Sequence, residues 1–366
     1  MQESQNLAAI IVDKIRAGGP IPFSDFMELA LYHPQLGYYT SARDQIGEDG
    51  DFFTSPCLTG LFGDLLGRQF EEMWQLLGGV PFTIVEIGAG TGVLCRDILS
   101  RLKEVPEMYR KLNYLIIEKS ESMRQRERRL LPEKVGWAAS LGEIGEVTGC
   151  IFSNELVDNF SVHRVVMQQD LMEVCVDFEG GFREVLQPAS DELRDYLARL
   201  GVVLAPGQEA EINLEATAWI QEVAATLRRG WVITIDYGHT ACDLYSRKSG
   251  TLACFHRHRV HHCPYDFIGE QDITSHVNFT ALDHWGRRRG LEVCGYTNQT
   301  HFLQGLGLAA RLRQWEDKDP GDHEMARLRT FLLEMGQKFR VLIQQKGVGR
   351  TFLSGLQFAR VCHPTR

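Results

Sequence analysis

The stretch Ile84-Val-Glu-Ile-Gly-Ala-Gly-Thr-Gly92 decides the fold. Its first four residues predict a short buried strand. Its three glycines, at alternate positions, predict a turn in which the backbone adopts φ > 0 and approaches a ligand closely. Residues 93–99 have the apolar spacing of a helix. A strand, a glycine-rich turn and a helix in this order predict the first unit of an α/β sheet, where such folds bind nucleotides.

This turn has two interpretations, each with a different class of nucleotide-like ligand. A dinucleotide fingerprint requires a third small residue at the position that Val93 occupies here. The pattern E-x-G-x-G-x-G from Glu86 to Gly92 instead resembles motif I of class I methyltransferases, which bind S-adenosylmethionine. The sulfonium and ammonium groups of that cofactor favour acids such as Glu86 near the turn. A dinucleotide enzyme and a turn without any ligand stay open as alternatives.

Composition and charge narrow the class of protein. The chain has 366 residues, 44% hydrophobic and 24% charged, as in a soluble globular protein of about two domains. The net charge of −9 argues against a broad nucleic-acid interface, so no nucleic-acid partner is expected. Nine scattered cysteines without a C-x-x-C pair suit a reducing compartment. Without a secretory signal or a long apolar run, we expect a cytoplasmic protein with no membrane span.

The remaining apolar runs predict a mostly parallel, seven-stranded sheet of the Rossmann-like class I methyltransferase type. Strands are expected at 83–87, 113–117, 137–139, 150–153, 231–236, 292–296 and, antiparallel, 355–361. Helices are expected at 4–17, 24–34, 57–77, 301–315 and 322–345, among others. We expect an N-terminal helical region with a cofactor-covering loop over 1–80, then a methyltransferase domain over 81–366 with insertions at about 160–230 and 298–350.

Polar side chains follow two of the expected strands. Glu118 ends the strand 113–117, where a carboxylate can accept both ribose hydroxyls of an adenosine in either cofactor class. Asn154, Glu155 and Asp158 follow the strand 150–153, at the corner that faces the methyl group in this fold. An acid there can orient a cationic nitrogen nucleophile and accept its proton. The alternatives are a solvated acid for Glu118 or Glu155 and a helix cap for Asp158.

The segment Cys254–Cys263 is rich in histidine and cysteine. It lacks the paired ligand spacings of structural zinc sites. Its interleaved Arg257 and Arg259 would also repel a cation. We therefore expect no metal and interpret the segment as a polar loop that lines a substrate cleft.

Several stretches together resemble one family, the MidA family, which includes a mitochondrial complex I assembly arginine methyltransferase and bacterial relatives. The stretches are 19–27, 33–39, 50–56, 86–92, 154–158, 236–239 and 269–279. The resemblance implies the class I fold and S-adenosylmethionine as cofactor. For the mitochondrial member it also implies symmetric dimethylation of an arginine in a complex I subunit.

The resemblance adds a second cofactor segment to the predicted site. It implies that a segment approaching the cofactor includes Gly50, Asp51, Thr54, Ser55 and Pro56. Asp51, between Gly50 and two phenylalanines, could face the ammonium group; the alternative is a packed loop in which Asp51 bonds its own turn. The other predicted cofactor residues are Glu86, Gly88, Ala89, Gly90, Gly92, Glu118 and Asn154, and the predicted catalytic residues are Glu155, Asp158 and Asn154.

The glycine-rich turn and the resemblance together predict an S-adenosylmethionine-dependent methyltransferase, and the resemblance implies that it acts on an arginine of a partner protein, such as a respiratory complex I subunit. Glu155 would orient the guanidinium, which stays charged at neutral pH and needs a base as the methyl arrives. A homodimer is a further expectation. The alternatives are a non-catalytic cofactor-binding assembly or scaffold factor and, less favoured, a dinucleotide-dependent oxidoreductase.

Overall fold

The structure, a computed structural model, describes residues 6–41, 60–131, 134–316 and 336–359. By their internal contacts the residues form two compact units. We call residues 1–52, 157–218 and 239–281 the N-terminal unit, and residues 53–156, 219–238 and 282–366 the sheet unit. The contacts thus group part of the expected insertion with the N-terminal helices. The expected domain boundary near residue 80 stays a prediction.

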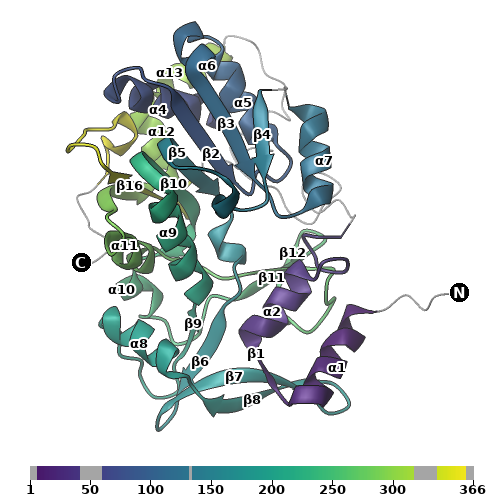
Figure 1. Cartoon of the computed structure of the whole chain (residues 1–366). Helices are drawn as coiled ribbons and strands as arrows, with labels where there is room; N and C mark the ends of the chain where they lie inside the picture. The colour runs from purple at the N-terminus through teal and green to yellow at the C-terminus, as the bar shows by residue number, and fades with distance from the viewer. Residues whose placement is uncertain (1–5, 42–59, 132–133, 317–335, 360–366) are drawn as a thin grey trace, which may run out of the picture. The chain divides into compact units, whose positions relative to one another are not determined.

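The sheet unit is built on a twisted sheet with the strand order β15-β16-β10-β5-β2-β3-β4 (Figure 1). Neighbouring strands from β10 to β4 run parallel, and β16 is antiparallel to both β10 and β15. The strands are β2 (Phe82–Ile87), β3 (Leu112–Ile117), β4 (Val135–Ala138), β5 (Val147–Asn154), β10 (Leu227–His239), β15 (Glu292–Asn298) and β16 (Phe339–Lys346). This confirms the predicted mostly parallel sheet with one antiparallel member.

Helices of the sheet unit bury their apolar faces against these strands. Phe70 of α4 packs on Phe152 of β5 with 5.2 Å between ring centroids, and α4 also packs on α5. The helices are α4 (Leu61–Leu76), α5 (Val93–Leu102), α6 (Pro106–Lys111), α7 (Glu121–Leu130), α12 (Gln299–Gly305) and α13 (Leu308–Glu316), with short 3₁₀ turns at Leu141–Glu143 and Ser354–Leu356. Two helices, α9 (Leu214–Thr226) and α11 (Phe279–Arg287), have residues in both units.

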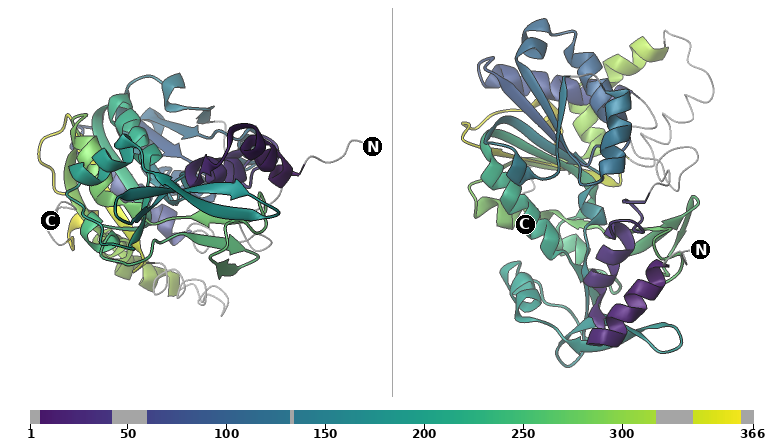
Figure 2. Two further views of the ribbon diagram at one scale, coloured as in Figure 1. Left: turned by 90° about the horizontal axis from the view of Figure 1, so that it is seen from below. Right: turned by 45° about the vertical axis from the view of Figure 1, so that its right-hand side comes forward.

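The N-terminal unit has two small sheets, with strand order β1-β7-β6-β9, β8 pairing with β7, and β12-β11-β13. Helices α1 and α2 pack on β7 (Figure 2). The strands of these sheets are β1 (Ile21–Pro22), β6 (His163–Met167), β7 (Leu171–Phe178), β8 (Phe182–Pro188), β9 (Glu209–Ile212), β11 (Ala253–His256), β12 (Arg259–His261) and β13 (Asp272–Thr274). The short strand β14 (Val277–Asn278) belongs to neither of them. The helices are α1 (Leu7–Gly18), α2 (Phe23–Tyr32), α8 (Asp191–Arg199), α10 (Ala241–Leu244) and a 3₁₀ turn at Val157–Asn159.

Two expected elements near the C-terminus are wrong. The end of the expected helix 322–345 is strand β16, and the expected strand 355–361 begins in a 3₁₀ turn, with its last two residues outside the described part. Because β16 is buried along nearly its whole length, its apolar residues do not alternate and the strand period is hidden. In the described ranges, no helix is long and apolar enough to cross a membrane.

Candidate active site

The glycine-rich turn joins β2 to α5 at the carboxyl edge of the sheet. Gly88, Gly90 and Gly92 have φ of 71°, 58° and 76°, so all three adopt the left-handed backbone that favours glycine. The Gly88 amide donates a hydrogen bond of 3.0 Å to the carbonyl of Ile117 in the neighbouring strand, and the Gly92 amide donates one of 2.9 Å to Ala89. The alternating glycines therefore follow from the backbone geometry of the turn.

Side chains from two other segments pack closely against this turn. A Cβ on Gly88 would lie 2.8 Å from Cδ1 of Leu156, which follows β5. A Cβ on Gly92 would lie 3.3 Å from Cδ1 of Leu131 and 3.6 Å from Cγ of Glu127, at the end of α7. The turn is thus enclosed by the loop after β5 on one side and by α7 on the other.

Glu86 lies in β2, two residues before the turn, and is 2% exposed. The Tyr114 hydroxyl donates a 2.6 Å hydrogen bond to its Oε2. Burial raises the pKa of Glu86 to about 7, while the Tyr114 hydrogen bond lowers it. At neutral pH both the protonated and the ionised form of this carboxyl are therefore populated, and a nearby cation would favour the ionised form.

Glu118 follows β3 at the same edge of the sheet. Its Oε1 accepts a 2.7 Å hydrogen bond from the backbone amide of Ser120. Burial raises the pKa of Glu118, and the Ser120 amide and the positive charge of Arg124 lower it. Since β2 and β3 are parallel neighbours, Glu118 and the turn share the sheet edge where the ribose of an adenosine binds in such folds.

Glu127 is a residue that the sequence did not single out. It is fully buried in α7, and Trp137 Nε1 donates a 2.7 Å hydrogen bond to its Oε2, while its Oε1 has no hydrogen-bond partner among the described residues. Burial, then the charge of Glu118, raises the pKa of Glu127 to about 8. In the sequence it is one charge among many between Arg124 and Arg129, so nothing marked it as buried.

The acidic corner after β5 lies at the same edge, because β5 is the other neighbour of β2. Glu155 has a φ of 54°, a left-handed conformation that a non-glycine residue keeps only when its surroundings fix it. Its amide donates a 2.9 Å hydrogen bond to Ile235 O, and Asn154 Nδ2 donates one of 3.0 Å to its Oε1. The predicted pair Asn154 and Glu155 therefore occupies a strained, well-defined position beside the turn.

The described contacts do not test the remaining predicted residues. Asp158 belongs to the N-terminal unit, is 5% exposed, and accepts a 2.9 Å backbone hydrogen bond from Ser275. Gly50, Asp51, Thr54, Ser55 and Pro56 lie outside the described residues. The assignment of individual residues to cofactor binding and catalysis stays a prediction.

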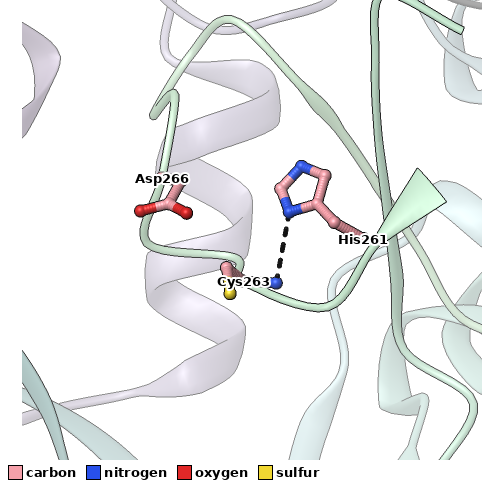
Figure 3. A group of neighbouring side chains, drawn as sticks. All are labelled: His261, Cys263 and Asp266. Atoms are coloured by element: carbon pink, nitrogen blue, oxygen red, sulfur yellow. Dashed lines mark hydrogen bonds between the residues drawn. The ribbon is translucent and has the colours of Figure 1, made fainter. Parts of the chain in front are cut away.

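A group of possible metal ligands lies in the histidine-rich segment (Figure 3). Donor atoms of His261, Cys263 and Asp266 lie within 4.8 Å of one another. However, the Cys263 amide donates a 3.3 Å hydrogen bond to Nδ1 of His261, and Cys263 and Asp266 are exposed. Nε2 of His261 is buried and has no hydrogen-bond partner among the described residues. The expectation of no metal therefore stays a prediction.

The turn and the acids around it fit S-adenosylmethionine. Left-handed glycines allow close approach of the backbone, Glu118 follows β3 at the same edge of the sheet, and the buried Glu127 oxygen lacks a described partner. Carboxyls of this kind suit the positive ammonium and sulfonium groups of the cofactor.

Comparison with known proteins gives the family. The family described as "Putative S-adenosyl-L-methionine-dependent methyltransferase" matches residues 65–297. The chain belongs to this family. This methyltransferase has 31% sequence identity and a TM-score of 0.88 to a Burkholderia thailandensis protein whose crystal structure contains S-adenosyl-homocysteine, over 97% of this chain and 95% of that one. Fold, cofactor and reaction type are thereby confirmed, and the dinucleotide and scaffold alternatives are not favoured.

The chain is also similar to curated animal proteins. The chain is 29% identical to the Drosophila melanogaster "Protein arginine methyltransferase NDUFAF7 homolog, mitochondrial", over 94% of this chain and 85% of the fly protein. It is 26% identical to the Homo sapiens "Protein arginine methyltransferase NDUFAF7, mitochondrial", over 83% and 74%. The predicted cytoplasmic location is wrong by this comparison, because these relatives are named mitochondrial. Lack of a secretory signal does not distinguish the cytoplasm from an organelle.

Proposed function

We propose that this methyltransferase transfers a methyl group to an arginine of a partner protein. The names of the fly and human relatives support an arginine acceptor. The net charge of −9 and the acids at the carboxyl edge suit a cationic acceptor. The observation that carries the proposal is Glu155, held in a left-handed conformation beside the cofactor turn.

Glu155 has two tasks in this proposal. S-adenosylmethionine supplies the electrophilic methyl group when it is bound. Glu155 orients the guanidinium so that one nitrogen lies in line with the methyl, and it takes the proton that this nitrogen loses. Asn154, which donates a 3.0 Å hydrogen bond to Oε1 of Glu155, keeps the carboxylate in one orientation.

Three finer points belong to the same proposal. Asp158 is the second acid with a proposed catalytic role. The protein partner is a subunit of an assembly such as respiratory complex I. The enzyme is a homodimer, which light scattering of the purified chain tests directly.

Transfer of a labelled methyl group tests the proposal. The enzyme is incubated with [methyl-³H]S-adenosylmethionine and host lysate, and labelled proteins are hydrolysed to amino acids. We expect label in methylarginines. Label confined to other amino acids would refute the arginine acceptor while leaving the methyltransferase activity intact.

Glu155→Gln tests the role of the acid. We expect it to bind S-adenosyl-homocysteine with unchanged heat in isothermal titration and to lose about 100-fold or more in turnover, because the base is gone. Glu107→Gln, at an exposed position in α6, is the matched control and should keep full activity. Full activity of Glu155→Gln would remove Glu155 from the mechanism.

A further inference from the structure

Asp236 is a fully buried carboxylate near the end of β10, the strand beside β5. Its Oδ1 accepts a 2.8 Å hydrogen bond from the amide of Tyr237, and its Oδ2 accepts one of 3.1 Å from the amide of Leu156. Ile235 is paired with Asn154, so Asp236 lies next to the point where β5 ends. A buried carboxylate thus binds the loop that carries the acidic corner.

These contacts attach both sides of Glu155 to β10. The amide of Glu155 itself donates to Ile235 O at 2.9 Å, and the next amide, that of Leu156, donates to Asp236. Between these two bonds Glu155 has its φ of 54°. A strained backbone of this kind persists where its surroundings over-determine it, and the bonds from the Glu155 amide to Ile235 and from the Leu156 amide to Asp236 both contribute to that here.

Leu156 also connects these hydrogen bonds to the cofactor turn. Its Cδ1 would be 2.8 Å from a Cβ on Gly88, so its side chain packs on the first glycine of the turn. A shift of the Leu156 amide would therefore change both the direction of Glu155 and the packing on the turn. One carboxylate, 80 residues away in sequence, fixes the point where the two halves of the site meet.

We infer that Asp236 is a positioning residue for methyl transfer: it holds the Leu156 amide and thereby fixes Glu155 against the cofactor turn. The inference rests on the proposed role of Glu155, but not on arginine being the acceptor. Asp236 acts through the loop and does not touch the reacting atoms.

Asp236→Asn changes this contact with little change in volume. A carboxylate has an acceptor oxygen for each of the two amides, whereas a carboxamide has one oxygen and one N–H₂ group. Either the Leu156 amide or the Tyr237 amide would then face the N–H₂ group and lose its acceptor. Since small displacements of a positioned group lower rates strongly, we expect the maximal rate to fall about 10- to 100-fold.

The experiment measures initial rates of label transfer from [methyl-³H]S-adenosylmethionine to host-lysate protein. We expect Asp236→Asn to lower the maximal rate while the KM for S-adenosylmethionine and the affinity for S-adenosyl-homocysteine change less than about threefold. Thr234→Val is the matched control, because Thr234 is fully buried on the same strand and Val has nearly the same shape. An unchanged maximal rate in Asp236→Asn would overturn the inference.

A double-mutant cycle separates positioning from a general structural effect. If Asp236 acts through Glu155, adding Asp236→Asn to Glu155→Gln should lower the maximal rate little further. If the two residues act independently, the fold-losses of the two single variants should multiply in the double variant. Label in amino acids other than arginine would refute the proposed acceptor but leave this cycle interpretable. Asp236→Glu, which keeps the carboxylate, should recover part of the rate.

The wild-type enzyme gives a test that needs neither variants nor activity. If the hydrogen bond to Asp236 holds the loop, the Leu156 amide should exchange with solvent as slowly as the amides of the buried strand β5. Exchange of the Leu156 amide at the rate of an exposed loop would overturn the inference, even if no acceptor were found or Asp236→Asn did not fold.

Discussion

The buried Glu86 should make the protein less stable as the pH rises, and Glu86→Gln should remove that effect. The pKa of Glu86 is about 7 in the folded protein against its ordinary 4.5. A group whose pKa is raised by folding binds its proton more tightly in the folded state. Its contribution to stability is therefore complete below pH 4.5 and is lost as the pH rises through about 7. The total loss is about 3 kcal/mol, and most of it falls between pH 5 and pH 8.

Urea unfolding of the wild type and of Glu86→Gln at pH 5 and pH 8 measures this difference. Glutamine is neutral at both pH values, and its carbonyl can still accept the Tyr114 hydrogen bond that Glu86 receives at 2.6 Å. We expect the variant to gain about 2–3 kcal/mol relative to the wild type on going from pH 5 to pH 8. Glu127 has a pKa raised in the same direction and is present in both proteins, so most of its contribution cancels. Because the charge of Glu86 is one cause of that raised pKa, the part that does not cancel has the same sign as the expected gain of the variant.

A control variant shows whether the pH effect belongs to Glu86. Glu121 is an exposed acid whose pKa is lowered, chiefly by the Arg124 hydrogen bond, so Glu121→Gln should not reproduce the gain at high pH. The reasoning would be refuted if wild type and Glu86→Gln lost stability in parallel between pH 5 and pH 8. The carboxyl would then be ionised at an ordinary pKa despite its burial.

Two further predictions concern the same turn. Gly88→Ala should lower the free energy of unfolding by about 2–4 kcal/mol and bind S-adenosyl-homocysteine at least tenfold more weakly, because its Cβ would meet Leu156 at 2.8 Å. The control Gly180→Ala has the same φ of 71° but open space, so it should lose only about 1–2 kcal/mol. Equal losses of the two variants in thermal unfolding would contradict the contact. Trp137→Phe removes the indole N–H that donates to Glu127, which raises the pKa of Glu127 further. The variant should therefore lose more stability at pH 9 than at pH 6. A loss of stability that is independent of pH would mean that the variant acts through packing alone.

The cofactor turn could be predicted from the sequence because its information is local. Three glycines at alternate positions are required by three left-handed backbones within five residues, and the acid at Glu118 follows its strand directly. Strand β16 could not be predicted in the same way. It is buried at almost every position from Phe339 to Gln345, and two of those positions are glutamines, so neither the strand period nor hydrophobicity identified it.

Residues that act through long-range contacts were also missed. Glu127 looks like part of a solvated charged helix until Trp137 and Gly92 are seen beside it. Asp236 was noted as part of a motif, but its bond to the Leu156 amide depends on the pairing of β10 with β5. Sheet neighbours of this kind are chosen by topology, which local spacing does not encode.

The two halves of the site therefore have different origins. The turn at Gly88 is specified by its own residues, whereas the corner at Glu155 is specified by a strand that comes 80 residues later. Leu156 joins them, since its amide is bound to Asp236 and its side chain lies against Gly88. A chain could keep an intact cofactor turn and still lose methyl transfer if the contacts of Leu156 with Asp236 and Gly88 were altered. Variants of these contacts should then lose turnover while they keep cofactor binding. For the same reason, proteins with the same glycine pattern need not share an acceptor.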